Sequence, residues 1–524
     1  MLWRYQGMML MTLEAPLFVD AEIFEFTQNP AVAKETYNKE SKNISNKRLF
    51  DRFLREKNEF KSLLIWLENG AYNNETYNKE SVKALLLKAI IELDSAIERQ
   101  INKVIHHDEF QALESAWRGL LYTTEQKYSL DKNKKVKVKV LNCSWTALSK
   151  DLSRAIEFDQ SEFYRLVYSN EYDTSGGEPF GIIIGNYQIG SNSNQIYNNH
   201  DIETLKMIAR IASASFSPFI TSLSPHFFGV DHYANLSNTL DITSHFEQVE
   251  YTQWRALRNM EESRFLGFTL PNILLRSPYL DDGTRQQAFK FKEKINNPET
   301  DCLWGNAAFA FSGIVIRAFC ESGWFGQIRG MNAARKDKGV VCDLPISRYE
   351  TEKYHTNNKP SINLQVGDRL EKELSDNGFI PLSAIKHTDH LVFFSNSSAQ
   401  QATNYDSKSA NVNAKLSSML QYVLCVSRFA HYIKLLGREK IGSFQTADAC
   451  QREINNWLNQ YTTATESASD EINSRAPLRS ANIKVKAIPG KPGHYYSIIQ
   501  LQPHFQLDQM ISTIKLVTEL APRN

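Results

Sequence analysis

The sequence predicts a mixed α/β protein, and three kinds of observation support this fold class. Some stretches carry apolar residues at helical spacing, others alternate apolar and polar residues with the two-residue period of a strand, and glycine-containing turns lie between them. Between residues 150 and 345 the two kinds of stretch alternate, as they do when helices cover a sheet. A chain of 524 residues suggests about three to five compact units, or fewer large ones.

The composition is that of a water-soluble globular protein, with 42% hydrophobic, 11% aromatic and 23% charged residues. Sixty Lys and Arg against 59 Asp and Glu leave a formal charge of +1, which provides no global field for binding nucleic acid. We find no signal peptide and no stretch with the about 20 near-continuous apolar residues of a membrane span. The six cysteines are far apart and form no C-x-x-C, which favours reduced thiols and a cytoplasmic protein.

The N-terminal 80 residues differ from the rest of the chain. They are rich in Asn and Lys and have few periodic apolar positions apart from a strand-like run at Leu17–Phe26, so we expect residues 1–80 to form an arm or linker. The heptapeptide Glu-Thr-Tyr-Asn-Lys-Glu-Ser occurs at 35–41 and again at 75–81. No matching period lies between the two copies, which favours a local duplication over a repeat architecture.

Residues 81–130 are expected to be a helical segment. Apolar residues between Val82 and Ile105 keep the spacing of one buried stripe, and a second helix is predicted for Glu109–Thr124. The period then changes to two, because Val136, Val138 and Val140 alternate with Lys135, Lys137 and Lys139. This alternation is more typical of a strand with a charged face, or of a lysine-guarded sheet edge, than of a phosphate-binding site.

Residues 131–395 are expected to form the α/β core. The predicted helices are Asp151–Tyr168, Asp201–Ala214 and Arg369–Asn377, and the predicted strands are Phe180–Gly185 and Leu391–Phe394. Gly176 and Gly177 predict a turn before the first of these strands. The aromatic-rich stretch between Trp304 and Phe325 indicates core or interface packing.

The C-terminal part begins after a polar segment, 396–414, for which we predict an exposed loop. Residues 415–524 are expected to hold an inner helix, Lys415–Leu436, followed by strands. Asn482–Ile488 and Tyr495–Leu501 flank a turn rich in Pro and Gly and predict a hairpin. The last apolar run, Met510–Leu520, fits the period of either a helix or a strand.

No motif of a familiar enzyme class is present in the sequence, which lacks the P-loop, dinucleotide-binding, nucleophile-elbow and zinc-protease patterns. The pairs His106–His107 and His387 with His390 each lack a third metal ligand at suitable spacing. Glycines between 181 and 190 border an apolar strand, where they more commonly permit close backbone approach than line a ligand cleft. We therefore expect no catalytic residue, no cofactor site and no metal site.

Several blocks of sequence occur in the same order as in a known family. They are Phe110–Leu120, Gly176–Gly181, Ser224–Gly229, Arg264–Pro271 with Leu275–Tyr279, Leu303–Ala310 with Gly323–Trp324 and Ile328–Gly330, Glu371–Leu382, Ser427–Lys434, Pro489–Tyr495 and Pro503–Leu507. Over residues 105–520 the chain thereby resembles the large sheath subunit of type VI secretion systems, the family called TssC, VipB or IglB. It departs from the family at Asn186, where Asp is usual, and at Lys359–Asn363, which replaces a Pro-Thr-Glu-type stretch.

The resemblance implies an α/β sheath fold that is completed by a small sheath subunit (TssB, VipA or IglA). Such heterodimers stack as six-fold rings into a helical polymer around an inner tube of Hcp, on a membrane-anchored baseplate. Contraction of the sheath drives the tube into a target cell. A AAA+ unfoldase of the ClpV or ClpB type is a further expected partner, which recycles the contracted sheath; neither nucleic acid nor membrane insertion is expected.

Two sets of assembly residues follow from the resemblance and from the strand edges. Terminal strands are expected to be exchanged between subunits through main-chain hydrogen bonds, the alternative being a hairpin that pairs only within its own chain. The expected exchange residues are Leu17, Val19, Val485, Ile488, Ile499, Leu501, Ile514 and Leu516. Basic residues off the apolar stripe of the inner helix are expected either to contact an acidic patch on the inner tube or to form a solvated face; they are Arg428, Lys434, Arg438 and Lys440.

Two other classes of protein remain as alternatives. A cytosolic α/β enzyme with a ligand site around Gly177–Gly190 and His387–His390 would be a monodisperse particle that needs no partner. The sheath of a phage-tail-like injection device would assemble from one chain, without a small second subunit. Co-expression with and without a small subunit distinguishes the three.

Overall fold

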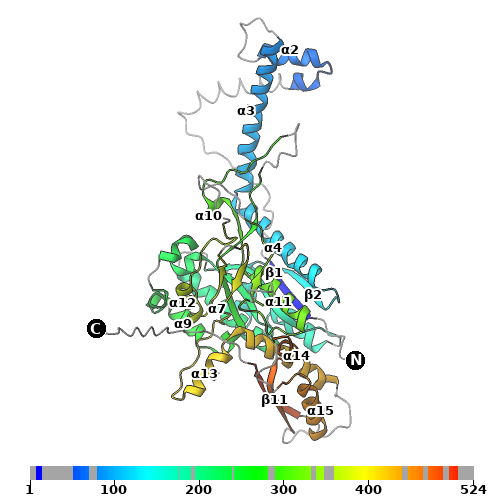
Figure 1. Ribbon diagram of the computed structural model, residues 1–524, viewed down its shortest axis with the longest axis vertical. Coiled ribbons are helices and arrows are strands. Elements are labelled where there is room, and N and C mark those ends of the chain that lie inside the picture. Colours follow the sequence, from blue (N-terminus) through cyan, green and yellow to red (C-terminus); the bar gives the residue numbers. More distant parts are fainter. Residues whose placement is uncertain are drawn as a thin grey trace, which may run out of the picture. The chain divides into compact units, whose positions relative to one another are not determined.

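The computed structural model describes residues 7–13, 51–69, 79–174, 176–190, 195–238, 241–280, 289–331, 338–346, 359–386, 388–439, 447–463, 470–487 and 495–504 (Figure 1). The chain divides into two compact units. The larger unit consists of Met1–Pro16, Val104–Leu280 and Glu293–Asn524, and the smaller unit of Leu17–Lys103 and Asp281–Lys292.

The smaller unit contains α2 (Glu59–Asn69) and most of α3 (Lys79–Ile105). The predicted helix from Val82 to Ile105 is confirmed, but the predicted burial of its apolar stripe is wrong. Leu93 is 62% exposed and Ile90 is 52% exposed, and Ile105 at the C-terminal end is the buried residue of this helix. The spacing of apolar residues correctly indicated a helix, but it cannot indicate whether the same chain supplies the covering surface.

A mixed sheet forms the centre of the larger unit, and the α/β fold class is confirmed. Among the described residues the strand order is β2-β1-β3-β4-β5-β9-β10-β8, parallel from β2 to β9 and antiparallel from there to β8. The strands are β1 (Gly7–Leu13), β2 (Val136–Asn142), β3 (Phe180–Ile189), β4 (Phe219–Leu223), β5 (Leu266–Leu270), β8 (Val340–Val341), β9 (Ile380–Ala384) and β10 (Leu391–Phe393). A separate antiparallel pair is formed by β6 (Ile273–Arg276) and β7 (Leu303–Gly305).

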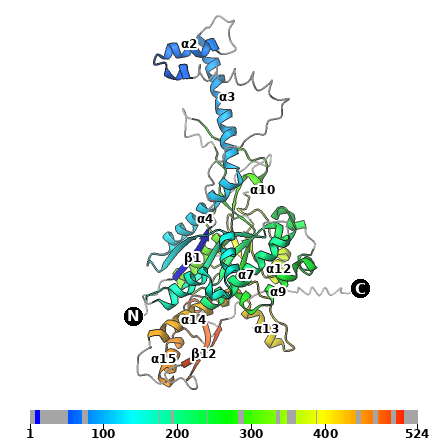
Figure 2. The same ribbon diagram turned by 180° about the vertical axis from the view of Figure 1, so that it is seen from behind.

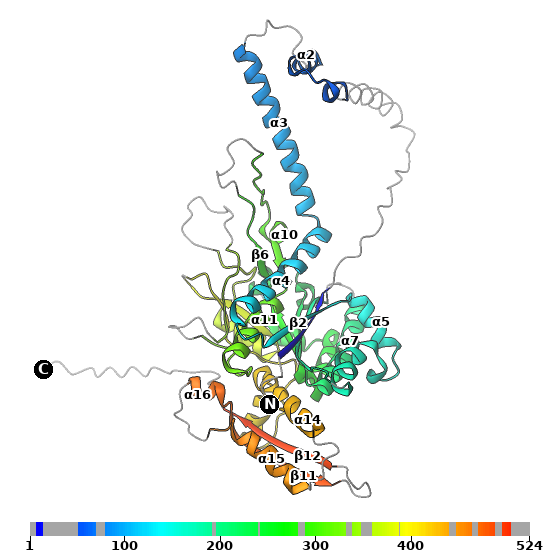
Figure 3. The same cartoon turned by 90° about the vertical axis from the view of Figure 1, so that its right-hand side faces the viewer.

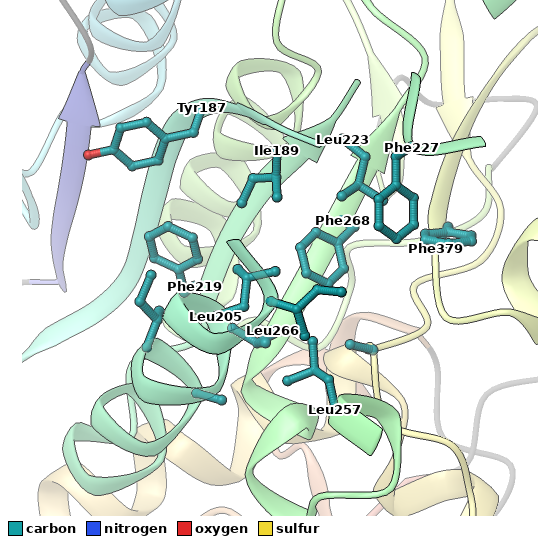
Figure 4. Packing of buried hydrophobic residues seen from close by; sticks show 14 of the residues in the cluster. Tyr187, Ile189, Leu205, Phe219, Leu223, Phe227, Leu257, Leu266, Phe268 and Phe379 are labelled. Atoms are coloured by element: carbon teal, nitrogen blue, oxygen red, sulfur yellow. The ribbon is translucent and has the colours of Figure 1, made fainter. Parts of the chain in front are cut away.

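Helices cover both faces of this sheet, which explains why its central strands are continuous apolar runs. Ile183 of β3 belongs to the same core cluster as Leu205 of a helix, whereas its neighbours Ile182 and Ile184 pack with Phe309 of another helix in a second cluster. Figure 4 shows part of the first cluster, with side chains from β3, β4 and β5 meeting those of the helices. The helices are α4 (Asp108–Leu130), α5 (Trp145–Arg154), α6 (Glu162–Tyr164), α7 (Gln195–Ser215), α8 (Ile242–Phe246), α9 (Thr252–Arg258), α10 (Pro298–Asp301), α11 (Ala308–Ser322) and α12 (Asp368–Asp376).

Strand β1 was not predicted from the sequence. It lies between β2 and β3 and pairs in parallel with both, with β2 from Gly7 to Leu13 and with β3 from Met8 to Leu13 (Figure 2). Its Met-rich sequence has no strict alternation and a single β-branched residue, Thr12, so the sequence pattern does not mark it as a strand and only its pairing with two neighbours defines it. The strand-like run predicted at Leu17–Phe26 lies outside the described residues.

The single helix predicted for Asp151–Tyr168 is wrong in its middle. Helix α5 ends at Arg154, where Ala155 adopts an extended conformation, and a π-helix, η3 (Arg165–Asp173), follows α6. The carboxylate of Asp151 accepts hydrogen bonds from the backbone N–H groups of Glu162 and Phe163, at 3.1 and 3.0 Å. These bonds satisfy the N-terminal donors of the second helix and stabilise the break.

The exposed polar loop predicted for 396–414 is also wrong in part. Asn396 and Ser398 are buried, and helix α13 (Lys408–Ser417) begins inside the segment. The Asn396 amide donates to the carbonyl of Ile328 at 3.0 Å, and such hydrogen bonds allow polar side chains to be buried. The predicted inner helix is divided into α13 and α14 (Leu420–Glu439) by a break at Ser418 and Met419.

The C-terminal part contributes most of a third core, to which Trp324, after α11, also belongs through its stacking on Phe429. Helices α14 and α15 (Ala447–Asn459) and strand β11 (Leu478–Ala487) contribute its residues, among them Phe429, Trp457 and Ile483. The predicted hairpin is confirmed, since β11 pairs antiparallel with β12 (Tyr495–Pro503), and its turn lies outside the described residues (Figure 3). A short helix, α16 (Asp470–Arg475), precedes β11.

Candidate assembly surfaces

The two edges of the C-terminal hairpin differ. Helix α15 covers the outer edge of β11, because Val485 N–H donates to the Gln451 side chain at 2.9 Å and Ile483 N–H donates to the Asn455 side chain at 3.2 Å. These N–H groups therefore point away from β12. In an antiparallel pair, two residues directly opposite each other direct their main-chain N–H and C=O groups either both toward each other or both outward. The β12 residues opposite Ile483 and Val485 therefore direct their main-chain groups to the other edge of the hairpin.

The outer edge of β12 is consequently the available edge of the hairpin. Ile499 stands opposite Ile483, and Ser497 stands opposite Val485, so the N–H groups of Ile499 and Ser497 face outward. No other residue in the described part of the chain pairs with this edge. An unpaired strand edge of this kind is a template for a strand from another chain.

Of the predicted exchange residues, the hairpin contains Val485, Ile499 and Leu501. The N–H of Val485 donates to the Gln451 side chain of α15, so Val485 lies on the edge that α15 covers. Ile499 lies on the opposite edge of the hairpin. The other five predicted exchange residues lie outside the described residues; they are Leu17, Val19, Ile488, Ile514 and Leu516. The sequence could identify the hairpin but not which of its edges the chain covers itself.

Arg428 of the predicted inner-tube set is buried, so the expectation that it points outward is wrong. It is 3% exposed, its guanidinium lies 4.8 Å from the Tyr432 ring, and it donates to the Tyr432 hydroxyl at 3.0 Å. Beside it, burial together with the positive charge of Arg428 lowers the pKa of His431 to about 3. The His431 ring is 2.9 Å from the carbonyl oxygen of Ser215, to which it donates as a neutral imidazole.

Lys434 and Arg438 tie α14 to the π-helix. Lys434 donates to the Tyr168 hydroxyl at 2.6 Å, and its ammonium lies 4.1 Å from the centre of the Tyr172 ring. Arg438 donates to the backbone carbonyls at the end of the π-helix, including that of Asp173 at 3.1 Å. Because cations are favourable at helix C-termini, Arg438 stabilises the end of the π-helix. Lys434 and Arg438 therefore both have a role inside this chain. Lys440 lies outside the described residues.

Strand β2 is a guarded edge of the main sheet, as the Lys–Val alternation predicted. It is the outermost strand, and Lys137 and Lys139 form ion pairs with Glu178 and Glu171. Because both ammonium groups have carboxylate partners, the alternative of a phosphate-binding cluster loses support.

His106, one of the histidines considered for a metal, takes part in a buried ion network. Its ring lies 3.1 Å from Glu293, which also accepts from Arg276, and Arg276 lies 3.0 Å from Glu114 of α4. Burial opposes the ionisation of Glu293, yet hydrogen bonds from Arg276 hold the pKa of this carboxyl below its usual range. Throughout the described residues no group of three His, Cys, Asp or Glu side chains could hold a metal ion, and His387 lies outside them.

One exposed surface was missed in the sequence analysis. Phe110, Trp117, Leu121 and Tyr128 lie on one face of α4 and are 39%, 63%, 50% and 92% exposed. The opposite face of α4 buries smaller residues, Ala116 and Gly119, against α11. The sequence does contain a signal for this surface, because a helix with apolar residues on two faces is expected to pack on both sides.

A strand edge with which no other described residue pairs, together with an exposed aromatic stripe, is typical of a protein that assembles with other chains. In the described part of the chain, no helix is long and apolar enough to span a membrane. Two family profiles match the sequence: the EvpB/VC_A0108 tail sheath N-terminal domain over residues 87–400 and the EvpB/VC_A0108 tail sheath gpW/gp25-like domain over 409–520. The chain belongs to this tail sheath family, VipB, which is a structural family and not an enzymatic one.

A similar relative is the type VI secretion system sheath protein TssC1 of Pseudomonas aeruginosa. It is 35% identical over 457 residues, which cover 86% of this chain and 89% of the relative. Among solved structures, the anti-feeding prophage baseplate has 9% identity and a TM-score of 0.39, covering 76% of this chain and 80% of that one. The contracted helical sheath of the same particle has 10% identity and a TM-score of 0.35, with coverages of 74% and 80%.

Proposed function

We propose that this chain is the large subunit of a type VI secretion contractile sheath. It co-assembles with a small sheath subunit around an Hcp inner tube and contracts to propel that tube into a target cell. The observation that carries the proposal is the 35% identity to a type VI sheath protein over 86% of the chain. The baseplate and an unfoldase of the ClpV or ClpB type are proposed partners on the same basis.

Electron microscopy of the full-length chain, expressed alone and with the small sheath gene of its own locus, tests this function. Tubules that form only on co-expression support a two-component sheath. Tubules formed by the chain alone support a single-chain injection device, and dispersed particles in both samples contradict the proposal.

We further propose that a strand from another subunit adds to the outer edge of β12. The donor strands come from the terminal segments that contain Leu17 and Val19, or Ile514 and Leu516. Support comes from α15, which covers the β11 edge and leaves the N–H groups of Ser497 and Ile499 directed outward. Head-to-tail contacts of this type extend into a helix when the rotation does not close a ring.

The substitution Ile499→Pro tests strand addition, because it removes an outward N–H and leaves the inward hydrogen bonds of the hairpin in place. The variant is expected to bind the small subunit normally and to form no tubules. Ile499→Val keeps the N–H and is expected to assemble, whereas Ile498→Pro removes an inward N–H and is expected to unfold the hairpin. Normal tubules from Ile499→Pro would contradict the proposal.

For the inner tube, we propose contact through Lys434, which is exposed, and Arg438 at the same end of α14. Buried Arg428 is not part of this surface. Lys434→Met removes the charge and retains a long side chain over the tyrosine rings. A tube contact predicts loss of tube-templated assembly while the heterodimer still forms, whereas an internal role alone predicts lower stability and normal assembly.

We also propose that the sheath core ends within residues 396–414 and that the C-terminal assembly region follows. The division between the two matched family domains, from residue 400 to 409, supports this boundary. Residues 1–80 are proposed to act as an arm outside the core.

A further inference from the structure

A groove of about 780 Å³ lies beside the C-terminal hairpin. Its walls come from the α13–α14 corner, the end of α7, a short 3-10 helix at Glu261–Phe265, and the end of β12. Apolar side chains form much of the lining: Phe216, Phe265, Leu416, Val423, Val426 and Leu501. A pocket of this size is large enough to hold several apolar side chains.

The last described residues of the chain form one wall of this groove. Leu501, Gln502 and Pro503 line it, and the backbone N–H of His504 donates to the carbonyl of Pro477 at 3.0 Å. The chain is therefore anchored at the groove where its final 20 residues, 505–524, begin. These residues lie outside the described part and contain the apolar run Met510–Leu520.

We propose that residues 505–524 of the same chain occupy this groove. Five residues, 505–509, separate the anchor at His504 from Met510, and they can span about 17 Å when extended. A segment tethered so closely has an effective concentration in the mM range, which favours binding within the chain. With residues 505–524 bound within their own chain, the strand proposed to add to β12 of another subunit comes from the segment that contains Leu17 and Val19.

Charge and domain boundaries agree with this occupant. Glu262 is a half-buried carboxylate on the groove wall, and the segment carries Lys515 in the middle of its apolar run. The neighbouring Glu261 is already close to Arg264, at 3.6 Å. The second matched family domain, 409–520, includes α14, β12 and most of the segment, so one family domain contains the segment and part of the groove wall. The end of α7 and the 3-10 helix Glu261–Phe265 belong to the first matched domain.

Limited trypsin digestion of the full-length chain, read by intact mass, measures whether Lys515 is protected. Val426→Glu places a charge in the groove and is expected to raise the rate of cleavage after Lys515 at least tenfold. Val412→Glu is the matched control, because Val412 is 58% exposed on α13 and does not line the groove; its cleavage rate is expected to equal that of the unaltered chain. Equal rates in all three proteins would overturn the proposal.

Cysteine cross-linking gives a second test that does not depend on a disruptive substitution. The pair Val426→Cys and Ile514→Cys, treated with a short bismaleimide, is expected to cross-link within one chain. The control pair Val249→Cys and Ile514→Cys, with Val249 exposed and outside the groove, is expected not to cross-link.

Co-expression of two differently tagged copies, each with one of the two cysteines, distinguishes binding within one chain from binding between subunits. Cross-links only between copies mean that a neighbouring subunit fills the groove, which overturns binding within the chain and leaves the proposed sheath function intact. No cross-link in either arrangement also overturns the proposal, because Ile514 then lies away from the groove. Failure of tubule formation in microscopy affects the proposed function alone.

Discussion

The main sheet and the C-terminal hairpin are both made of strands, but they differ in what covers them. Strands β3, β4 and β5 are flanked by strands on both sides and by helices on both faces, so nearly all their side chains are buried. The hairpin has one edge covered by Gln451 and Asn455 of α15 and one edge with which no other described residue pairs. Burial in the sheet therefore stabilises the subunit, while the incomplete coverage of the hairpin leaves a surface available for assembly.

The largest expected effect is in the sheet core. Phe379 is fully buried and stacks on Trp254 with ring centres 5.7 Å apart, so Phe379→Ala is expected to lower the free energy of unfolding by about 3–5 kcal/mol. The matched control is Tyr128→Ala on α4, where the ring is 92% exposed and a change within about 0.5 kcal/mol is expected. Urea unfolding measures the change in unfolding free energy of both variants. Similar losses of stability would contradict the distinction between the sheet core and the exposed face of α4.

The next effect concerns the buried network of α4 and β6. Arg276→Met leaves Glu293 buried without its guanidinium partner, and we expect a loss of about 3 kcal/mol or more in unfolding free energy. The double substitution Arg276→Met with Glu293→Gln removes both charges and is expected to recover part of that loss. A double variant less stable than the single one would contradict this account of the network.

A smaller effect is expected from pH at His431. The folded-state pKa is about 3, below the roughly 6.5 of an unfolded histidine, so the unfolded chain binds more protons between these values. The stabilising contribution is complete above about pH 6.5 and decreases as the pH falls towards 3, by up to about 1.4 kcal/mol per pH unit. Unfolding measured at pH 7, 6 and 5 should show a shallower decline for His431→Gln than for the unaltered chain, and equal slopes would exclude His431 as the cause.

The smallest effect on stability is expected at the exposed stripe of α4. Trp117 is 63% exposed, so Trp117→Ser should change unfolding free energy by about 0.5 kcal/mol or less. If the stripe is an assembly surface, the same variant reduces tubule formation on co-expression. Normal assembly by Trp117→Ser would show that the stripe is not needed for assembly. The hairpin and α3 would then remain as the candidate assembly surfaces.

The sequence predicted elements whose pattern is local. The periodicity of residues 82–105, the apolar run from Phe180 and the Pro-Gly turn of the hairpin each identified an element that the structure contains. It missed β1, which depends on two neighbouring strands, and the break at Ala155, which depends on hydrogen bonds from Glu162 and Phe163 to the Asp151 carboxylate that a helical period does not reveal. The family could be recognised from collinear blocks, although the chain has no single motif for it.

By itself, then, the sequence determined the fold class, the order of most elements and the absence of familiar catalytic motifs, because spacing and turn chemistry are properties of short segments. Only the tertiary structure decided which surfaces are covered. Arg428 looked like a free cation on a helix and is buried against Tyr432, whereas the apolar stripe of α3 looked like core and is exposed. Coverage depends on contacts between residues far apart in the chain, and a local pattern carries no information about which partner supplies them.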